Sequence, residues 1–437
     1  MSRLPNDCFA LPPGVEWTPV DAALAFLKER LAPVTTTETV DLFHAAGRYL
    51  ATDAIATRAH PATDNAAVDG YAFAHPGTES AVMRLRDGRS AAGAPWQATA
   101  EQGPLAAGEA VRIFTGAPMP DGADTVVLQE DVERAGEGER AEKGETIRFP
   151  VPKKPGANRR RAGENIAPGA AVLSAGALVT PQSLGQLAAA GLSQIEVHRP
   201  LRVGVLSTGD EVADPAGPTT ALPPAAVIDS NRPMLLSMIA GFGGEAVDLG
   251  IVADDRAAVE ARLSSAAAQC DVIVTSGGAS GGDEDHMAAS LEAAAARREG
   301  AFHLWRIAVK PGRPLAMGLW QGCPVFGLPG NPVAAFVCTL IFVAPALRRL
   351  GGGLWWEPQP LMVPSGFDYA KKPGRREYLR VRLGADGRLQ KYRSEGSGLI
   401  EGLLWSDGLA DLAHDAGPLK AGEPIRYLPY PNLGLRP

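Results

Sequence analysis

Acidic side chains gather at two places in the sequence, each in the loop that follows a short apolar run. Asp210 and Glu211 follow the first run, and the acidic segment 283–285 follows the second. Carboxylates this close together repel an anionic ligand unless a hard cation such as Mg²⁺ bridges them. Any one of them could instead be an acid that the dipole of a following helix favours. For the five acids together we favour the metal-binding interpretation.

A glycine-rich loop leads into the second group of acids. Residues 275–282 read Thr-Ser-Gly-Gly-Ala-Ser-Gly-Gly, and a helix is predicted just beyond them. Backbone N–H groups with so few side chains around them can bind an anion, and the start of a helix strengthens that tendency. The alternative is an ordinary glycine-rich turn, because the loop matches neither G-x-G-x-x-G nor the P-loop lysine motif.

Basic residues supply candidate partners for the same anion. Lys310 and Arg313 stand in a Lys-Pro-Gly-Arg-Pro segment, whose prolines would hold both side chains in place as phosphate clamps. A surface hairpin with solvated charges explains that segment equally well. The run Arg159–Arg161 is either a solvated loop or a basic patch for an anionic ligand, and a nucleic-acid role is less favoured in an acidic protein.

Two further motifs lie in the N-terminal third of the chain. The segment Asp64–Tyr71 carries Asp64 and Asp69 among small side chains, and Thr115–Pro120 is a stiff loop after an apolar run. Taken separately, an Asx-turn and a β-bulge would explain them. The histidines form no metal-binding motif, and we keep only His286, beside the acids, as a candidate.

The segments that carry this chemistry follow strands of a predicted parallel sheet. From residue 200 onward, short apolar strands alternate with helices, which is the pattern of βαβ units with helices on both faces of a sheet. Ligands bind beyond the carboxyl ends of such strands, so the loops 207–211, 275–285 and 328–332 are expected to converge. The strands are predicted at 201–206, 246–252, 272–275 and 325–328, and the helices at 232–240, 256–268, 284–297 and from 332 onward.

Smaller units surround this sheet. A helix is predicted to begin at Thr18 and to end by Pro33, and a second helix at 180–191. Between them, the region 50–150 has the short apolar runs of a β-rich insert. The linker 351–353 leads to a hairpin and a small all-β tail.

Composition bounds the class of protein. Of 437 residues, 45% are hydrophobic and 21% are charged, which is ordinary for a folded protein, and the net charge of −7 does not favour nucleic acid as a partner. Four cysteines without a C-x-x-C pair indicate a reducing compartment and no zinc–thiolate site. We expect no signal peptide. The apolar run 333–347 is interrupted by Pro345 and predicts a buried helix, so we expect a cytoplasmic protein.

Taken together, these motifs resemble those of the molybdopterin molybdenumtransferase family, whose eukaryotic relative is the C-terminal domain of gephyrin. The resemblance covers about residues 15–430, and seven motifs in the family order make it specific. The matching segments are Asp64–Tyr71, Thr115–Pro118, Asn158–Ile166, Ser207–Glu211, Ser276–Asp285, Lys310–Pro314 and Gly327–Pro332.

The resemblance implies an activity and an assembly. The family's enzymes take adenylylated molybdopterin and molybdate, insert molybdenum into the dithiolene and release AMP. They use Mg²⁺ and work as elongated homodimers of four-domain subunits. The dithiolene brings its own sulfur ligands, so such a protein needs no cysteine cluster. Transient contacts with the adenylyltransferase and with acceptor molybdoenzymes are also implied, whereas nucleic acid and membrane are not.

The expected fold class is therefore multi-domain α/β, with a doubly wound, mostly parallel sheet domain as its centre. A β-rich insert domain, a small N-terminal α+β domain and a small C-terminal β-barrel complete it. The boundaries are 1–50 with 148–198 for the α+β linker domain, 51–147 for the insert, 199–350 for the molybdopterin-binding sheet domain and 351–437 for the barrel.

The family's functional positions carry over motif by motif. Catalytic roles fall on Asp64, Thr115, Glu211, Asp285, Lys310 and Arg313. The implied metal ligands are Asp64, Glu211, Asp285 and an acid at Asp254 or Asp255, of which we take Asp254. The implied substrate-binding residues are Ser207, Thr208, Gly209, Asp210, Ser276, Gly277, Gly278, Ser280, Pro329, Gly330, Asn331 and Pro332.

This sequence departs from the family pattern at four places. Asn165 stands where many relatives have an aspartate, which removes one candidate metal ligand. Asp283 replaces a usual Glu, His286 a usual aromatic residue and Gly281 a usual valine. These departures leave the metal affinity, and the choice between molybdenum and tungsten, open.

Two rival functions remain open at this point. A molybdopterin adenylyltransferase shares the sheet domain and a glycine-rich loop, but it is essentially that domain alone, so the N-terminal motifs and the β tail argue against it. A scaffold like gephyrin would bind receptor peptides near its tail. A pure scaffold does not need the family's functional residues, so their presence favours catalysis; they are Asp64, Glu211, Asp285 and Lys310.

Overall fold

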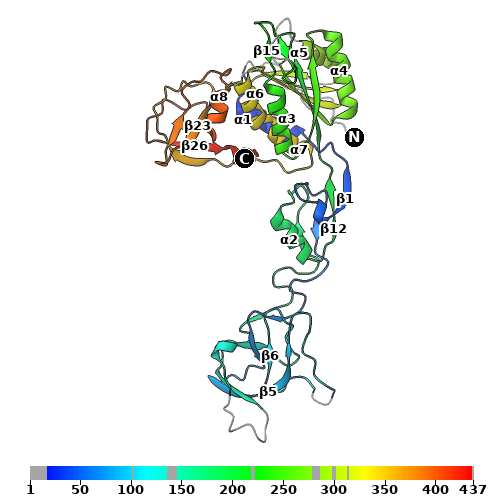
Figure 1. Cartoon of the computed structure of the whole chain (residues 1–437), viewed down its shortest axis with the longest axis vertical. Helices are drawn as coiled ribbons and strands as arrows, with labels where there is room; N and C mark the ends of the chain where they lie inside the picture. Colours follow the sequence, from blue (N-terminus) through cyan, green and yellow to red (C-terminus); the bar gives the residue numbers. More distant parts are fainter. Residues whose placement is uncertain are drawn as a thin grey trace.

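The protein is elongated, with its largest unit at one end and a β unit at the other (Figure 1). The computed structural model describes residues 17–100, 103–134, 145–217, 222–277, 286–297, 302–312 and 314–435. In Figure 1 the helices α3 to α7 surround the large sheet, the strands β5 and β6 lie at the far end, and α2 with β1 and β12 lies between them. The C-terminal strands β23 and β26 lie beside the large unit.

A six-stranded sheet organises the large unit, in the order β16-β13-β17-β21-β20-β18. The first four strands are parallel, and the last two are antiparallel to their neighbours. Their bounds are Arg202–Thr208 (β13), Glu245–Val252 (β16), Val272–Ser276 (β17), Phe302–Arg306 (β18), Pro314–Trp320 (β20) and Cys323–Leu328 (β21). The sheet is mostly parallel, as the sequence predicts.

Helices cover both faces of this sheet, because successive side chains of each strand point to opposite sides. Val205 and Val274 face one core with α3, whereas Leu206 and Ile273 face another with α4 and α5. The helix bounds are Val20–Arg30 (α1), Asn231–Gly241 (α3), Arg256–Gln269 (α4), His286–Ala296 (α5), Pro332–Cys338 (α6) and Ala344–Leu350 (α7). The structure therefore has the doubly wound arrangement expected from the sequence.

The apolar segment from residue 332 forms one continuous helix. A π-helical segment, Thr339–Val343, joins α6 to α7, and Pro345 is the second residue of α7. Proline has no N–H to donate, which is consistent with an irregular turn there. By length and composition the helix Pro332–Leu350 could cross a membrane, but 89% of its most apolar window is buried inside the protein. It is a core helix, as predicted.

The connecting unit is built on the strand pair β1 (Thr37–Asp41) and β12 (Gln194–His198). Helix α2 (Pro181–Ala189) begins at a capping box formed by Thr180 and Ser183. The remaining short elements are η1 (Leu42–His44), β2 (Ala54–Ile55) and β11 (Ala171–Leu173). Helix α1 does not pack here: Val20, Ala23 and Leu27 lie in the core of the large unit. The domain boundaries themselves remain a prediction.

The unit at the far end is a six-stranded sheet in the order β7-β4-β6-β5-β9-β8. Its strands are β4 (Gly70–Phe73), β5 (Ser80–Ser90), β6 (Glu109–Ile113), β7 (Thr125–Leu128), β8 (Glu133–Arg134) and β9 (Thr146–Pro150). A short pair, β3 (Asn65–Ala66) with β10 (Arg159–Arg160), and the 3₁₀ turn η2 (Gln129–Asp131) complete it. Separate apolar clusters cover its two faces.

The C-terminal unit is a sheet in the order β19-β23-β25-β26-β22, with β24 paired to β23. The predicted hairpin is present as β23 and β24. Strand β19 comes from between β18 and β20 of the large sheet, so this segment joins the C-terminal unit. The remaining bounds are β14 (Val212–Ala213), β15 (Val227–Ile228), β19 (Val309–Lys310), β22 (Leu361–Pro364), β23 (Arg376–Leu383), β24 (Leu389–Lys391), α8 (Glu401–Trp405), β25 (Gly408–Leu412), β26 (Pro424–Pro429) and η6 (Tyr430–Leu433).

Candidate functional site

Loops from neighbouring strands of the large sheet meet at its carboxyl edge. The Gly277 N–H, just after β17, donates to the Leu328 carbonyl at the end of β21 over 3.1 Å. The Asn231 amide, at the start of α3, donates to Ser276 Oγ and to the Gly330 carbonyl, both over 2.7 Å. Two of the three predicted loops are therefore fixed to each other in the described part of the chain.

Asn231 is a residue that sequence reasoning missed. It is buried, and its Oδ1 has no hydrogen-bond partner in the described structure, and the same holds for Oγ of Ser207 at the end of β13. Buried polar atoms normally have a partner, so these two atoms mark a place where a bound group could supply one. The available signal was the polar run Asp-Ser-Asn-Arg at 229–232, which leads into the predicted helix 232–240.

Two glycines let the backbone pass close to the side chains of this edge. Gly277 has φ +87°, and a Cβ there would lie 2.8 Å from Thr208 Oγ1. Gly209 has φ +139°, and a Cβ there would lie 2.7 Å from Glu211 Oε2. Residues with a side chain rarely adopt either φ value, and a Cβ would also force the neighbouring side chains to move, so both positions favour glycine.

The acids at this edge crowd each other. The Asp210 N–H donates to Asp254 Oδ2 over 3.3 Å, and the Asp254 N–H donates to Asp210 Oδ1 over 3.0 Å. Burial raises the pKa of Asp254, and the charges of Asp210 and Glu211 raise it further, while the N–H of Asp210 and the charge of His286 act in the opposite direction. Repulsion of this kind is what a bound cation would relieve.

The donor chemistry of these acids fits Mg²⁺, which prefers carboxylate oxygens. Among the described residues, however, no group of three or more His, Cys, Asp or Glu side chains is arranged around one point. The predicted metal ligands Asp254 and Glu211 lie at this edge, whereas Asp64 lies in the far unit. The fourth, Asp285, lies outside the described residues, as do Gly278, Ser280 and Arg313.

Side chains of the C-terminal unit contact the amine of Lys310. Its Nζ lies 2.5 Å from Glu395 Oε2, 3.3 Å from Tyr369 Oη and 3.5 Å from Glu377 Oε2. Next to it, the Val333 N–H at the start of the long helix donates to the Ser397 carbonyl over 3.0 Å. A loop of the C-terminal unit therefore lies against both Lys310 and the segment Pro329–Pro332.

Asp64 and Thr115 lie together in the far unit and not at the sheet edge. Asp64 Oδ1 accepts from the Ala162 N–H over 2.8 Å, and Asp64 Oδ2 lies 3.4 Å from the Arg159 guanidinium. The N–H and hydroxyl of Thr115 both donate to Asp69 Oδ1 over 2.7 Å, and these bonds lower the pKa of Asp69. Within one chain the predicted residues thus form two groups, in the two units at opposite ends of Figure 1.

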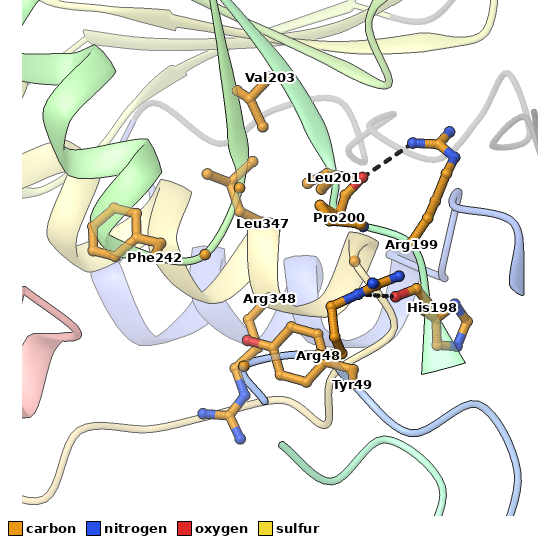
Figure 2. A pocket seen from close by; sticks show the side chains of 14 residues that line it. Arg48, Tyr49, His198, Arg199, Pro200, Leu201, Val203, Phe242, Leu347 and Arg348 are labelled. Atoms are coloured by element: carbon orange, nitrogen blue, oxygen red, sulfur yellow. Dashed lines mark hydrogen bonds between the residues drawn. The ribbon is translucent and has the colours of Figure 1, made fainter. Parts of the chain in front are cut away.

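A pocket at the junction of the connecting unit and the large unit holds none of the predicted residues (Figure 2). Arg48 Nε donates to the His198 carbonyl over 2.9 Å, and the Arg348 guanidinium stacks on Tyr49, 5.7 Å from the ring centre. Close by, Arg199 makes a bidentate ion pair with buried Asp271, at 2.6 and 2.7 Å. These contacts link the connecting unit to the large unit.

Known families match this chain along most of its length. Residues 18–191 match the MoeA N-terminal region (domain I and II), 204–349 a probable molybdopterin binding domain, and 362–430 the MoeA C-terminal region (domain IV). The chain is 35% identical to a molybdopterin molybdenumtransferase of Haemophilus influenzae, over 95% of this chain and 99% of that protein. It is 33% identical to one from Nostoc sp., over 90% and 89%.

Solved structures agree with this similarity. The crystal structure of the molybdopterin biosynthesis MoeA protein from Pyrococcus horikoshii OT3 superposes with a TM-score of 0.75 at 26% identity. The match covers 95% of this chain and all of that one. The expected multi-domain architecture of mixed α/β sheets is therefore confirmed.

Proposed function

The chain belongs to the molybdopterin molybdenumtransferase family, and from that premise we propose that it transfers molybdenum into molybdopterin during biosynthesis of the molybdenum cofactor. It is a transferase. The observation that carries the proposal is the sheet edge, where loops of two strands meet at Asn231 beside two buried, unpartnered polar oxygens.

We propose that the substrates are adenylylated molybdopterin and molybdate, and that AMP is released. The charges at the sheet edge support a phosphate-bearing substrate that binds together with a cation. Asp210, Glu211 and Asp254 would repel a bare phosphoanhydride, so a magnesium ion held by Glu211 and Asp254 would be needed to neutralise the substrate's charge. Lys310 would then offset negative charge that develops on the leaving phosphate.

The proposed role of Lys310 requires an exchange of partners. The shortest contact of the Lys310 amine is with Glu395, so a substrate phosphate must share Lys310 with that carboxylate or displace it. The remaining contact with Tyr369 would keep the amine in place. Asp64 and Thr115 act as a second group of functional residues, with Asp69 holding the Thr115 hydroxyl.

We further propose that the enzyme is a cytoplasmic homodimer. In one chain the two groups of functional residues belong to different units, and a dimer in which the far unit of one subunit reaches the sheet edge of the other would unite them. Contacts with the adenylyltransferase that supplies the substrate, and with acceptor molybdoenzymes, would be transient.

The test is to incubate purified protein with adenylylated molybdopterin, Mg²⁺ and molybdate, and to measure both AMP and active cofactor. Asp64→Ala and Asp285→Ala should each reduce turnover by at least about 100-fold while the circular dichroism spectrum stays unchanged. Asp121→Ala, an acid of the far unit outside the proposed site, is the matched control. Wild-type turnover in both site variants contradicts the residue assignment, and absence of AMP with the wild type contradicts the activity.

The rival functions fit less well. An adenylyltransferase would need only the sheet unit, whereas the matches to MoeA regions extend over residues 18–191 and 362–430. A scaffold would not need the crowded acids of the sheet edge. Asn165→Asp tests whether position 165 belongs to the metal site. Higher activity at low Mg²⁺ would identify Asn165 as a weakened metal ligand, and unchanged activity would show that the replacement has no effect on metal binding.

A further inference from the structure

The far unit carries an arginine-rich groove that the proposed function does not use. It lies on the sheet β7-β4-β6-β5-β9-β8, and its lining includes Tyr71, Arg89, Arg112, Phe114 and Arg134. Aromatic rings and guanidinium groups alternate along it. The groove lies beside Thr115, because Phe114 directly precedes that residue.

Two of these arginines stand side by side on neighbouring strands. Arg89 of β5 and Arg112 of β6 are register partners, so their side chains leave the sheet on the same face. Both guanidinium groups also stack on one ring: they lie 5.5 Å and 5.3 Å from the centre of Phe114. Arg112 stacks on Tyr71 as well, at 5.0 Å.

Like charges directly opposite each other on neighbouring strands destabilise a sheet. The aromatic rings compensate in part through cation–π attraction, and they hold the planar guanidinium groups in fixed orientations. The five N–H groups of a guanidinium lie in its plane, and those that contact neither a ring nor Gln129 stay available at its edge. Those edges are suited to bind the oxygens of an anion.

The other arginines of the groove are already neutralised, and this distinguishes the pair. Arg86 lies 2.6 Å from Glu109, and Arg134 lies 3.2 Å from Glu145. In the described part of the chain, Arg112 has a neutral hydrogen-bond partner, Gln129, and neither Arg89 nor Arg112 has a carboxylate within ion-pair distance. Two positive charges without a directly paired carboxylate therefore lie together in an open groove. Acids are nearby, since the charge of Arg112 helps to lower the pKa of Asp69 and the groove is also lined by Asp87 and Glu145.

We propose that the Arg89–Arg112 pair binds a tetrahedral oxyanion of the phosphate and molybdate class. The anion would accept hydrogen bonds from both guanidinium groups and remove the repulsion between them. Such an anion has two sources, free molybdate or the phosphate of a nucleotide-bearing ligand. The site is separate from the sheet edge, and oxyanion binding here does not depend on the proposed activity.

Binding is measured on the purified full-length protein by isothermal titration calorimetry and by the shift in melting temperature. Sodium molybdate, inorganic phosphate and AMP are titrated separately, each against sodium chloride at equal ionic strength. Saturable binding that raises the melting temperature is expected for the wild type. Arg112→Ala and Arg89→Ala should each weaken that binding by at least about tenfold, because each removes charged hydrogen bonds to the anion.

Arg148→Ala is the matched control. Arg148 lies in the same unit on β9, is exposed and does not line the groove, so this variant changes the net charge equally and should bind like the wild type. Arg89 is exposed, so its variant tests the site even if Arg112→Ala fails to fold. Arg89→Lys should recover part of the affinity, since it restores the charge without the planar fork.

The ligands distinguish the two sources. Binding of molybdate that phosphate and AMP do not displace identifies the metal oxyanion, and competition by AMP identifies a phosphate group. The proposal is overturned if no anion binds beyond the chloride reference. It is equally overturned if Arg89→Ala and Arg112→Ala bind with wild-type affinity, because the anion then occupies another place.

Discussion

At the scale of single residues, the structure changes what Lys310 and Thr115 can do. The sequence predicts Lys310 as a phosphate clamp, but Glu395, 85 positions away, lies against its amine. Thr115 depends in the same way on Asp69. Sequence reasoning could find Lys310 and Thr115 because they stand in recognisable motifs. It could not find Glu395 or Asn231, because their importance comes from distant segments that only the fold brings together.

Glu395 should make the stability of the C-terminal unit depend on pH. Burial alone would raise the pKa of Glu395, but the hydrogen bond and charge of Lys310 lower it below its ordinary value. A carboxyl with a lowered folded-state pKa stabilises the protein above its unfolded-state pKa, about 4.3 for Glu, and this stabilisation is lost as the pH falls through the folded-state pKa. At pH 7, Glu395→Gln should therefore have a free energy of unfolding that is lower than that of the wild type by about 1 kcal/mol or less. This difference in stability should disappear below about pH 4.

Scanning calorimetry between pH 3 and pH 8, roughly the range in which carboxyl groups complete their titration, checks this expectation. Glu401→Gln is the control, because Glu401 is an exposed acid of the same unit that pairs with exposed Arg393. A difference between Glu395→Gln and the wild type that stays constant with pH would show that the lost contact is not ionic.

At the scale of elements, four of the six strands of the large sheet and its helices follow from the sequence within a few residues, whereas β18 and β20 are not among the predicted strands. The predicted strand 272–275 is β17, Val272–Ser276, and the predicted helix 256–268 is α4, Arg256–Gln269. Alternating apolar runs and capping residues are local signals, so local reasoning finds them. The position of β19 was not predictable in this way, since pairing with β23 is a contact between segments about 70 residues apart.

A substitution of Gly277 tests how strongly the site depends on the backbone directly after β17. A Cβ at this position would approach Thr208 Oγ1 to 2.8 Å, and φ is +87°, so Gly277→Ala should lower the free energy of unfolding of the large unit by about 1–3 kcal/mol. It should also reduce turnover, because the loop after β17 would shift away from β21. Urea denaturation and the AMP-release assay measure the two effects.

Gly241→Ala is the control for that variant. Gly241 ends α3 in the same unit, and a Cβ there meets nothing within 4 Å. Its stability should equal or exceed that of the wild type, because alanine reduces the freedom of the unfolded chain. Equal stability of Gly277→Ala and Gly241→Ala would mean that the loop after β17 adapts without loss.

At the scale of the whole molecule, the junction between the units determines where the far unit can reach. Asp271, whose side chain is fully buried, accepts from both terminal nitrogens of Arg199 and from the Arg202 N–H over 2.8 Å. This contact ties the segment after β12 to the start of β17. Buried charges with this many hydrogen bonds hold their partners rigidly. This contact therefore restrains the connecting unit where it leaves the large unit, and the far unit, which carries Asp64 and Thr115, lies at the opposite end of the molecule (Figure 1).

Because the two groups of predicted residues lie in units at opposite ends of one chain, we predict that two subunits share each site. Asp64→Ala and Glu211→Ala, each nearly inactive as a pure variant, should complement each other when they are co-expressed with two different tags and purified as a heterodimer. One of the two sites would then hold both substitutions and the other neither, so activity should return to about half that of the wild type. Sedimentation analysis confirms the dimer beforehand, and the Asp64→Ala homodimer with both tags is the control. An inactive heterodimer would place each complete site within one chain, and the far unit would then have to move toward its own sheet edge during turnover.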